Sequence, residues 1–411
     1  MLRENQQEHD QEHDGCAGRD WDSVRARVRQ FVEQRIYPLE RELDASHAPD
    51  AKRLMADLML AAKRADLWAL GHPRELGGHG MPFMDYVRVN EVIGRSHHAM
   101  QALGTLSLQD SLMLARHGRP EWRERYLKPI VSGEFVPSFA MTEPDVASSD
   151  PTRLETRARL EDGVWVISGR KWFTTGAALA RYTTVMCRTE EDAPAHDAFS
   201  LIIVPTDAVG YRIVRDTPIL GIQGGHYEIE LLDVRVPEAN LLGPRGHGFR
   251  IAQQRLGPGR IFHCMRWLGQ AQRAFELMCR RLHERVTSGG TLAGKQLMQG
   301  HVFESAAQIH SCRLLTLSAA RALDEGREAR EEIGIIKVLG ARMLHDVIDR
   351  AIQVFGAMGL TADTPLELMY RHARAARIYD GPDEVHVQSV AKRLLSRHKD
   401  GAPGVDFAAL S

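Results

Sequence analysis

The sequence predicts a mainly α-helical protein with a central β domain, in the order helical, β, helical. Apolar residues recur at helical spacing from Trp21 to about residue 135, and β-branched and aromatic residues alternate with polar ones from there to about Leu242. The helical period returns after Gly243. We therefore expect a disordered tail at 1–20, an N-terminal helical domain at 21–135, a middle β domain at 136–242, a C-terminal helical bundle at 243–400 and a second tail at 401–411.

Each part has its own elements. In the first part an apolar stripe predicts a helix over 28–43, a second helix follows over about 50–66, and helical patterning resumes from Asp85 to about Leu127. Four candidate strands follow: Val164–Ile167, Tyr182–Cys187, Phe199–Val204 and Tyr227–Val236. No long helical pattern separates them, which favours an antiparallel barrel or sandwich over a parallel sheet. Long helices are then expected from Ile261 to Leu282, from about Ala329 to Phe355 and from Val385 to about Ser396.

Composition excludes several classes of protein. The 411 residues include 53 Lys and Arg against 54 Asp and Glu, a balance that argues against a general nucleic-acid binder. No apolar run approaches the roughly 20 residues that span a bilayer. The polar, acidic N-terminus resembles neither a secretory signal nor a mitochondrial presequence, so we expect a cytoplasmic protein.

Metal and nucleotide motifs are missing from the sequence. The five cysteines are scattered and contain no CxxC pair. The adjacent His97 and His98 fall on a helical pattern, on which neighbouring side chains point in different directions, so no metal site is predicted. The chain also lacks GxxxxGK[ST], a GxGxxG between strand and helix, HExxH and GxSxG.

Four segments carry the chemistry: FAMTEPDVASSD at 139–150, GRKWFTTGA at 169–177, AIQVFGAMG at 351–359 and RIYDGPDEVH at 377–386. In this order and spacing they resemble the acyl-CoA dehydrogenase family, from about Val28 to about Leu395. RLGPGRIFHCMR and the Asp of YDGPDEVH look most like a branch in which some members carry a kinase-like domain ahead of this one. The resemblance implies the family's three-domain fold, bound FAD, an acyl-CoA substrate that is dehydrogenated between its α and β carbons, an electron-transfer flavoprotein as partner, a homotetramer or homodimer, and a place in fatty acid β-oxidation.

A flavin needs hydrogen bonds along its pyrimidine edge and an apolar wall against its rings. By the resemblance, Phe139, Met141 and Thr142 supply the hydrogen bonds, and Phe173, at a position where the family usually has Trp, supplies the wall. The alternative from the residues alone is that 139–175 is simply the core of a β domain. Two further matches complete this set: Thr175, which corresponds to a hydroxyl that bonds the flavin, and Ser148, which lies where flavin and CoA meet.

Asp380 is the candidate catalytic base. Removing an α-proton from a thioester requires a positioned carboxylate in an apolar site, and the resemblance implies that hydride then passes from the β-carbon to flavin N5. The family usually has Glu here, so Asp shortens the reach by one bond, roughly 1.5 Å. Some members instead carry the base just before an Arg that matches Arg260, but that residue is Gly259 here. The alternative is a solvated Asp in an Asp-Gly turn.

The remaining site residues follow from the resemblance. Arg260 and Tyr379 are expected to line the acyl-CoA channel, the alternatives being a surface cation at a helix N-terminus and a core aromatic residue. An Arg can grip phosphate oxygens through two parallel bonds. The residues expected at FAD are Arg285 and Gln296 at the pyrophosphate of a neighbouring subunit, Gln353 and Gly356 near the adenosine part, and Pro382 and Glu384 beside the flavin.

Three other functions stay open. A flavin oxidase of the acyl-CoA or nitroalkane type would pass electrons to oxygen, and a non-catalytic flavin-binding homologue would not turn over. The branch resemblance adds the breakdown of 4-hydroxyacyl-CoA. The sequence does not specify the chain length, branching or hydroxylation of the acyl group.

Overall fold

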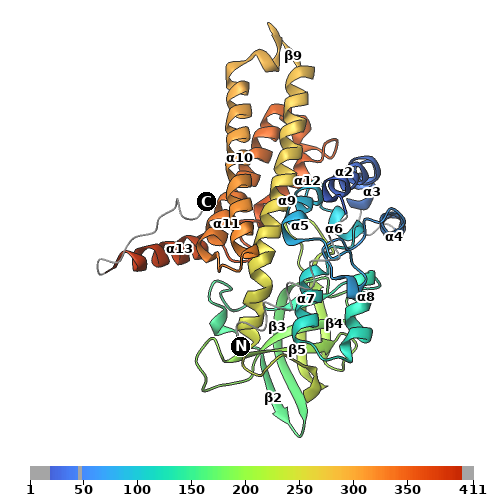
Figure 1. Ribbon diagram of the computed structural model, residues 1–411, viewed down its shortest axis with the longest axis vertical. Coiled ribbons are helices and arrows are strands. Elements are labelled where there is room, and N and C mark those ends of the chain that lie inside the picture. Colours follow the sequence, from blue (N-terminus) through green and yellow to red (C-terminus); the bar gives the residue numbers. More distant parts are fainter. Residues whose placement is uncertain (1–18, 45–48, 400–411) are drawn as a thin grey trace.

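The computed structural model describes residues 19–44 and 49–399. Long helices form one end of the molecule, a β-sheet forms the other, and shorter helices pack along one side (Figure 1). The two predicted tails lie, apart from Arg19 and Asp20, outside the described residues. No helix in the described ranges is both long and apolar enough to cross a membrane.

The N-terminal layer consists of short helices rather than two or three long ones. The predicted helical stretch from Asp85 to Leu127 is broken, because Gly104 adopts a φ of 66° and the chain turns on either side of it. The elements are α2 (Trp21–Phe31), η2 (Val32–Ile36), η3 (Tyr37–Leu39), α3 (Glu40–Asp44), α4 (Pro49–Arg64), η4 (Arg74–Leu76), α5 (Phe83–Ile93), α6 (Ala99–Ala102), α7 (Leu108–His117), η5 (Arg123–Leu127) and α8 (Lys128–Ser132).

The middle part forms one largely antiparallel sheet with the strand order β6-β7-β3-β2-β4-β5-β8, and β1 pairs with β4 in parallel. The predicted strands fall within β3, β4, β5 and β7. The sequence analysis missed β6 because four successive residues, 212–215, are exposed, so the strand lacks alternation. The bounds are β1 (Ser138–Ala140), β2 (Arg157–Glu161), β3 (Val164–Thr175), β4 (Tyr182–Arg188), β5 (Phe199–Pro205), β6 (Tyr211–Asp216), β7 (His226–Pro237) and β8 (Leu241–Leu242), with short η6 (Pro151–Arg153) and η7 (Glu238–Asn240).

The C-terminal part is built on α9 (Gly248–Glu284), a helix of 37 residues that passes straight through Pro258. The predicted apolar stripe from Ile261 to Leu282 covers only its later part. Gly257, Pro258 and Gly259 are helix breakers locally, but packing against α7 outweighs that preference. Gln109 on α7 donates its side-chain N–H to the carbonyl of Arg255 at 3.0 Å. The other elements are β9 (Val286–Thr287), β10 (Gly290–Thr291), η8 (Leu292–Gly294), α10 (Gln296–Asp324), α11 (Arg330–Phe355), η9 (Gly356–Leu360), α12 (Leu366–Ala375) and α13 (Asp383–Arg397).

Helices α5 and α9 cross in close contact because glycines stand at the crossing. A Cβ added to Gly94 would lie 2.2 Å from the Cα of Arg266, and one added to Gly269 would lie 1.9 Å from the carbonyl oxygen of Glu91. Such distances leave no room for any side chain. The small residues therefore set the spacing between the N-terminal layer and α9.

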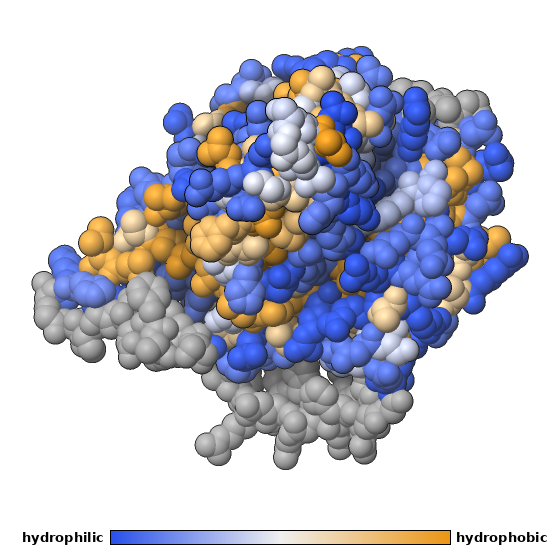
Figure 2. Space-filling model, turned by 90° about the horizontal axis from the view of Figure 1, so that it is seen from above, coloured by the Kyte–Doolittle hydropathy of each residue, from blue (hydrophilic) through white to orange (hydrophobic). Residues whose placement is uncertain are grey.

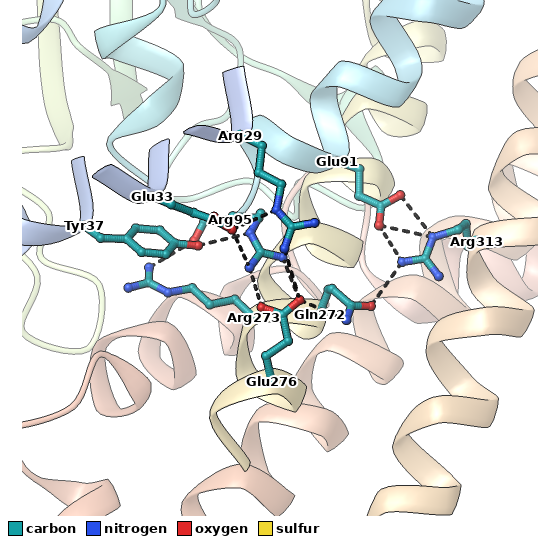
Figure 3. Close-up of polar contacts among 9 residues, drawn as sticks. All are labelled: Arg29, Glu33, Tyr37, Glu91, Arg95, Gln272, Arg273, Glu276 and Arg313. Carbon is teal, nitrogen blue, oxygen red and sulfur yellow. Dashed lines mark hydrogen bonds and ion pairs between the residues drawn. The ribbon is translucent and has the colours of Figure 1, made fainter. Parts of the chain in front are cut away.

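A group of ion pairs holds this contact in register (Figure 3). Arg273 on α9 binds both oxygens of Glu40, at 2.8 and 2.7 Å, and both residues are only 8% exposed. Arg95 binds the Glu276 carboxylate and the Tyr37 hydroxyl. Because a buried charge without a partner is costly, these pairs specify one docking position of the N-terminal layer.

Arg273→Ala should destabilise the protein by about 3–5 kcal/mol, because it leaves the Glu40 carboxylate buried without its cation. Thermal unfolding of the FAD-loaded protein measures the effect. The matched control is Arg53→Ala, which removes an exposed ion pair with Asp50 and should cost less than about 1 kcal/mol. Equal midpoints for the two variants would contradict the assignment.

Candidate active site

Asp380 lies on a tight turn between α12 and α13. Its φ is 55° and that of Gly381 is 99°, so two successive residues occupy the left-handed region. The carbonyl oxygen of Asp380 accepts hydrogen bonds from Arg260 Nε at 3.1 Å and from His386 Nε2 at 3.0 Å. A strained backbone that is held by hydrogen bonds from two other residues of the same chain is typical of a functional site rather than of a solvent-exposed turn.

Arg260 does not lie at a helix N-terminus, which was the alternative to a role in the site. It sits inside α9 and is partly buried, and burial lowers the pKa of its guanidinium while Asp380 opposes that effect. The structure also explains why Gly259 carries no base. A Cβ at Gly259 would lie 2.1 Å from Nε2 of Gln109, so a carboxylate there would have to displace that side chain.

His263 faces the Asp380 carboxylate, and the sequence analysis missed it. Its Nε2 lies 3.3 Å from Oδ2 of Asp380, and its Nδ1 lies 3.0 Å from a guanidinium nitrogen of Arg266. Since an Arg can only donate, Nδ1 must accept and Nε2 must carry the proton. Burial, helped by Arg266, lowers the pKa of His263 to about 3. At neutral pH, His263 is thus neutral, with its Nε2–H facing the Asp380 carboxylate.

The sequence did contain a signal for His263. It stands three residues after Arg260 in RIFHCMR, and residues three apart share one face of a helix. Arg260 and Asp380 were already candidate site residues. The helix face that carries Arg260 was therefore the place to look for a further one. Nothing in the local pattern distinguishes its neighbour Arg266, which orients the imidazole.

Aromatic side chains flank the carboxylate. The Trp267 indole N–H donates to the Tyr379 hydroxyl at 2.8 Å, and the ring centre of His263 lies 5.0 Å from that of Tyr379. Tyr379 remains 36% exposed, so it forms part of an open wall rather than of a closed core. These rings form the aromatic side of the Asp380 site.

Cationic groups lie beneath the turn. Asp383, 2% exposed, accepts from Arg377 at 2.8 Å and from Arg342 at 3.3 Å. Lys337 on α11 is fully buried, and within the described residues its Nζ has no hydrogen-bond partner. Burial lowers the pKa of Lys337 to about 8, although Asp383 and Asp380 oppose the shift. The turn that carries Asp380 thus lies next to three cationic side chains, those of Lys337, Arg342 and Arg377.

The segments FAMTEP and GRKWF, distant in sequence, lie together. The amide of Trp172 donates to the Thr142 carbonyl at 3.0 Å, and the Thr142 hydroxyl donates to the Trp172 carbonyl at 2.9 Å. Lys171 is fully buried and bonds both the Met141 carbonyl and Glu143, each at 2.8 Å. The proton of the Thr142 hydroxyl is therefore used inside the protein, and its lone pairs remain able to accept.

Phe173 occupies a β-bulge. The register of β3 against β7 shifts between Lys171 and Thr174, and Phe173 adopts a φ of 49° that is unusual for a bulky residue. The bulge turns its ring outward, leaving it 42% exposed. Beside it, the Thr175 hydroxyl is 2.9 Å from Nδ1 of His226. A flavin requires an aromatic face against its rings, and hydroxyl and backbone groups that form hydrogen bonds with its edge. The residues described here offer both, so they fit FAD.

Arg255 joins this region to α9. It forms an ion pair with Asp110 at 3.0 Å, and its guanidinium lies 4.8 Å from the ring centre of Phe139 in β1. Arg255 precedes Arg260 by five positions on the same helix. The segment around Phe139 and Thr142, called the flavin segment below, and the Asp380 turn therefore contact the same part of α9.

Two of the predicted FAD residues, Arg285 and Gln296, lie far from the Phe139 region. Arg285 ends α9 and Gln296 begins α10, at the end of the bundle opposite the sheet, where β9 is labelled in Figure 1. At 1.5 Å per helical residue, Arg285 is about 45 Å along α9 from Arg255. The others are exposed or at helix ends: Gln353 in the last turn of α11, Gly356 with a φ of 65°, Ser148 in the loop after β1, Pro382 as the N-cap of α13 and Glu384 in its first turn.

Known proteins resemble this chain along most of its length. Three family models match in order: the acyl-CoA dehydrogenase N-terminal domain at 19–134, the middle domain at 138–234 and the C-terminal domain at 246–395. The chain is 42% identical to the Mycobacterium tuberculosis protein FadE2, described as a probable acyl-CoA dehydrogenase, over 91% of this chain and 95% of that protein.

Two further matches are informative. Mouse acyl-CoA dehydrogenase family member 10 is 41% identical over 89% of this chain, but the match spans only 36% of that longer protein. A solved structure from Mycobacterium abscessus, provisionally described as an acyl-CoA dehydrogenase, superposes with a TM-score of 0.87 at 35% identity, covering 92% of this chain and 98% of that one.

The predicted fold class and resemblance are thus confirmed, and so is FAD as the cofactor. The chain belongs to the acyl-CoA dehydrogenase family and is an FAD-dependent oxidoreductase that dehydrogenates acyl-CoA.

Proposed function

We propose that Asp380 removes the α-proton of an acyl-CoA thioester and that desaturation between the α and β carbons follows. The observation that carries this proposal is the turn itself: a carboxylate on a strained backbone whose carbonyl is held by Arg260 and His386. Because both hydrogen bonds are to the backbone carbonyl, they fix the position of Asp380 without using its carboxylate. The shorter Asp is thereby given a defined position, which proton transfer requires.

His263 has a positioning role in this proposal. Its Nε2–H faces Oδ2, and in this proposal Oδ1 receives the substrate proton. The His263, Trp267 and Tyr379 side chains keep water from surrounding the carboxylate. Arg260 holds the turn from α9 and, in the channel role that the resemblance implies, contacts the substrate as well.

FAD, when bound, supplies the acceptor for the β-hydride. The residues that would hold its flavin are Phe139, Met141 and Thr142 through their backbone and hydroxyl groups, Phe173 as an aromatic wall, and Thr175. Ser148 would stand where the flavin meets CoA. Pro382 and Glu384 would lie beside the flavin, with their backbone rather than their side chains available to it.

We also propose a homo-oligomer, a dimer or tetramer, in which Arg285 and Gln296 reach the FAD pyrophosphate of a neighbouring subunit. Gln353 and Gly356 would lie near the adenosine part of FAD. The length of α9 supports this, because Arg285 lies too far along the helix to meet the Phe139 region of its own chain. Apolar side chains are also exposed on the outer helices, such as Leu297 at 81% and Phe303 at 70% on α10. Figure 2, which views the helical end, shows hydrophobic residues gathered among hydrophilic ones on this surface.

The physiological setting follows the resemblance. Electrons would pass to an electron-transfer flavoprotein, in a cytoplasmic pathway of fatty acid β-oxidation. Oxygen consumption that matches acyl-CoA turnover without an added acceptor would instead favour the oxidase alternative.

Asp380→Asn should lower kcat for acyl-CoA oxidation by about 10²–10⁴-fold, because the amide cannot take a proton. FAD content should stay at the wild-type level. Anaerobic reduction of the bound flavin by a panel of straight-chain, branched and 4-hydroxylated acyl-CoAs measures the rate. The control is Asp363→Asn, an exposed carboxylate before α12. Wild-type flavin reduction by Asp380→Asn would contradict the proposal.

His263→Phe should lower kcat by roughly 10-fold or more with little change in KM, because the carboxylate loses its orienting donor while the apolar wall is kept. His263→Gln, which retains an N–H donor, should recover part of the rate. If Phe and Gln variants are equally slow, the hydrogen bond is not what His263 contributes.

Arg285→Ala should weaken FAD retention without altering the fold, because it removes a cation from the FAD pyrophosphate of the neighbouring subunit. The FAD-to-protein ratio after gel filtration measures this. Arg280→Ala, five residues earlier and exposed, is the control. Unchanged retention in Arg285→Ala would remove this residue from the cofactor site.

A further inference from the structure

A second cluster of ligating side chains lies away from the Asp380 turn. His97 and His98 both direct Nε2 at one oxygen of Asp44, at 3.0 and 2.7 Å. The expectation that these adjacent histidines point in different directions is wrong, because residues 94–98 form a turn between α5 and α6 instead of a regular helix. Their ring centres are only 3.8 Å apart.

The three ligand atoms lie within 4.8 Å of one another. Zn²⁺ binds imidazole nitrogen and carboxylate oxygen at about 2.0–2.2 Å, which places neighbouring atoms of a tetrahedral shell about 3.3 Å apart. The observed nitrogen-to-oxygen distances need to lengthen by only a few tenths of an ångström to admit an ion. The side chains of His98, His97 and Asp44 are 13%, 29% and 31% exposed, so the cluster is partly enclosed but open to entry from solvent.

His372 on α12 stands next to this cluster. Its ring centre lies 4.7 Å from that of His97, and both residues line a small pocket together with Asp44. The charged groups under the pocket, Glu40 and Arg273, already neutralise each other.

We propose that Asp44, His97 and His98 form a binding site for a divalent transition metal of the Zn²⁺ class, with His372 close enough to complete the shell after a rotation of its side chain. Imidazole and carboxylate ligands favour Zn²⁺ and its neighbours over Mg²⁺ or Ca²⁺. The metal would join α3 of the N-terminal layer to α12, the helix that leads into the Asp380 turn. Its role is therefore structural, since a bound ion would tie that turn to the N-terminal layer.

The test uses the full chain with FAD bound, without an affinity tag, after treatment with EDTA. Isothermal titration with ZnCl₂ should show one ion per chain with a Kd on the order of 1 μM or tighter. Elemental analysis after gel filtration should give the same stoichiometry. Zn²⁺ should also raise the thermal unfolding midpoint, because it binds the folded form.

His98→Ala and Asp44→Asn should each weaken binding at least about 10–100-fold, since removing a ligand costs no less than removing an outer-shell partner. His97→Gln is a milder second variant, and FAD absorbance with circular dichroism confirms that each variant is folded. The matched control is His310→Ala, an exposed histidine on α10, which should bind Zn²⁺ as the wild type does. Absence of stoichiometric binding by the wild type, or equal binding by all variants, would overturn the proposal.

Discussion

The packing of α9 against every other part of the molecule is the constraint on which the site depends. Near its start Gly248 touches the backbone of Ser200 in β5, and further along Gly269 touches Glu91 of α5. Between these contacts Arg255 meets the flavin segment and Arg260 meets the Asp380 turn. Because both contacts come from one rigid helix, the spacing of flavin segment and carboxylate is set by helix geometry and not by loops.

Elements with strong periodicity could be predicted from the sequence, and elements that depend on tertiary contacts could not. Helix α11 was recognised by its regular apolar pattern, and β4 and β5 as short buried runs rich in β-branched and aromatic residues. The first part of α9 was missed because Pro258 breaks a helix locally, whereas contacts with α7 sustain it. The β-bulge at Phe173 could not be predicted from the local sequence pattern either, because it arises from the pairing of β3 with β7.

The candidate site divides in the same way. Segments recognised by their motifs, such as those around Thr142 and Trp172, do meet in space. Their partners were not predictable: Lys171 is buried to hold Glu143, and His263 is oriented by Arg266. Pairings of this kind join residues whose types are common on any surface, so only the fold reveals them. The Asp44 and His98 contact likewise depends on a turn that helical periodicity hides.

Removal of the α-proton by the Asp380 carboxylate can be measured separately from hydride transfer. The substrate is 2,2-dideuterated 3,3-dimethylbutanoyl-CoA in ordinary water, and loss of deuterium from C2 is followed by mass spectrometry. The β-carbon of this thioester carries no hydrogen, so no hydride can leave and only proton exchange is measured. We expect washout catalysed by the FAD-loaded wild type and none above background with FAD-loaded Asp380→Asn. Washout at the wild-type rate by Asp380→Asn would contradict this expectation.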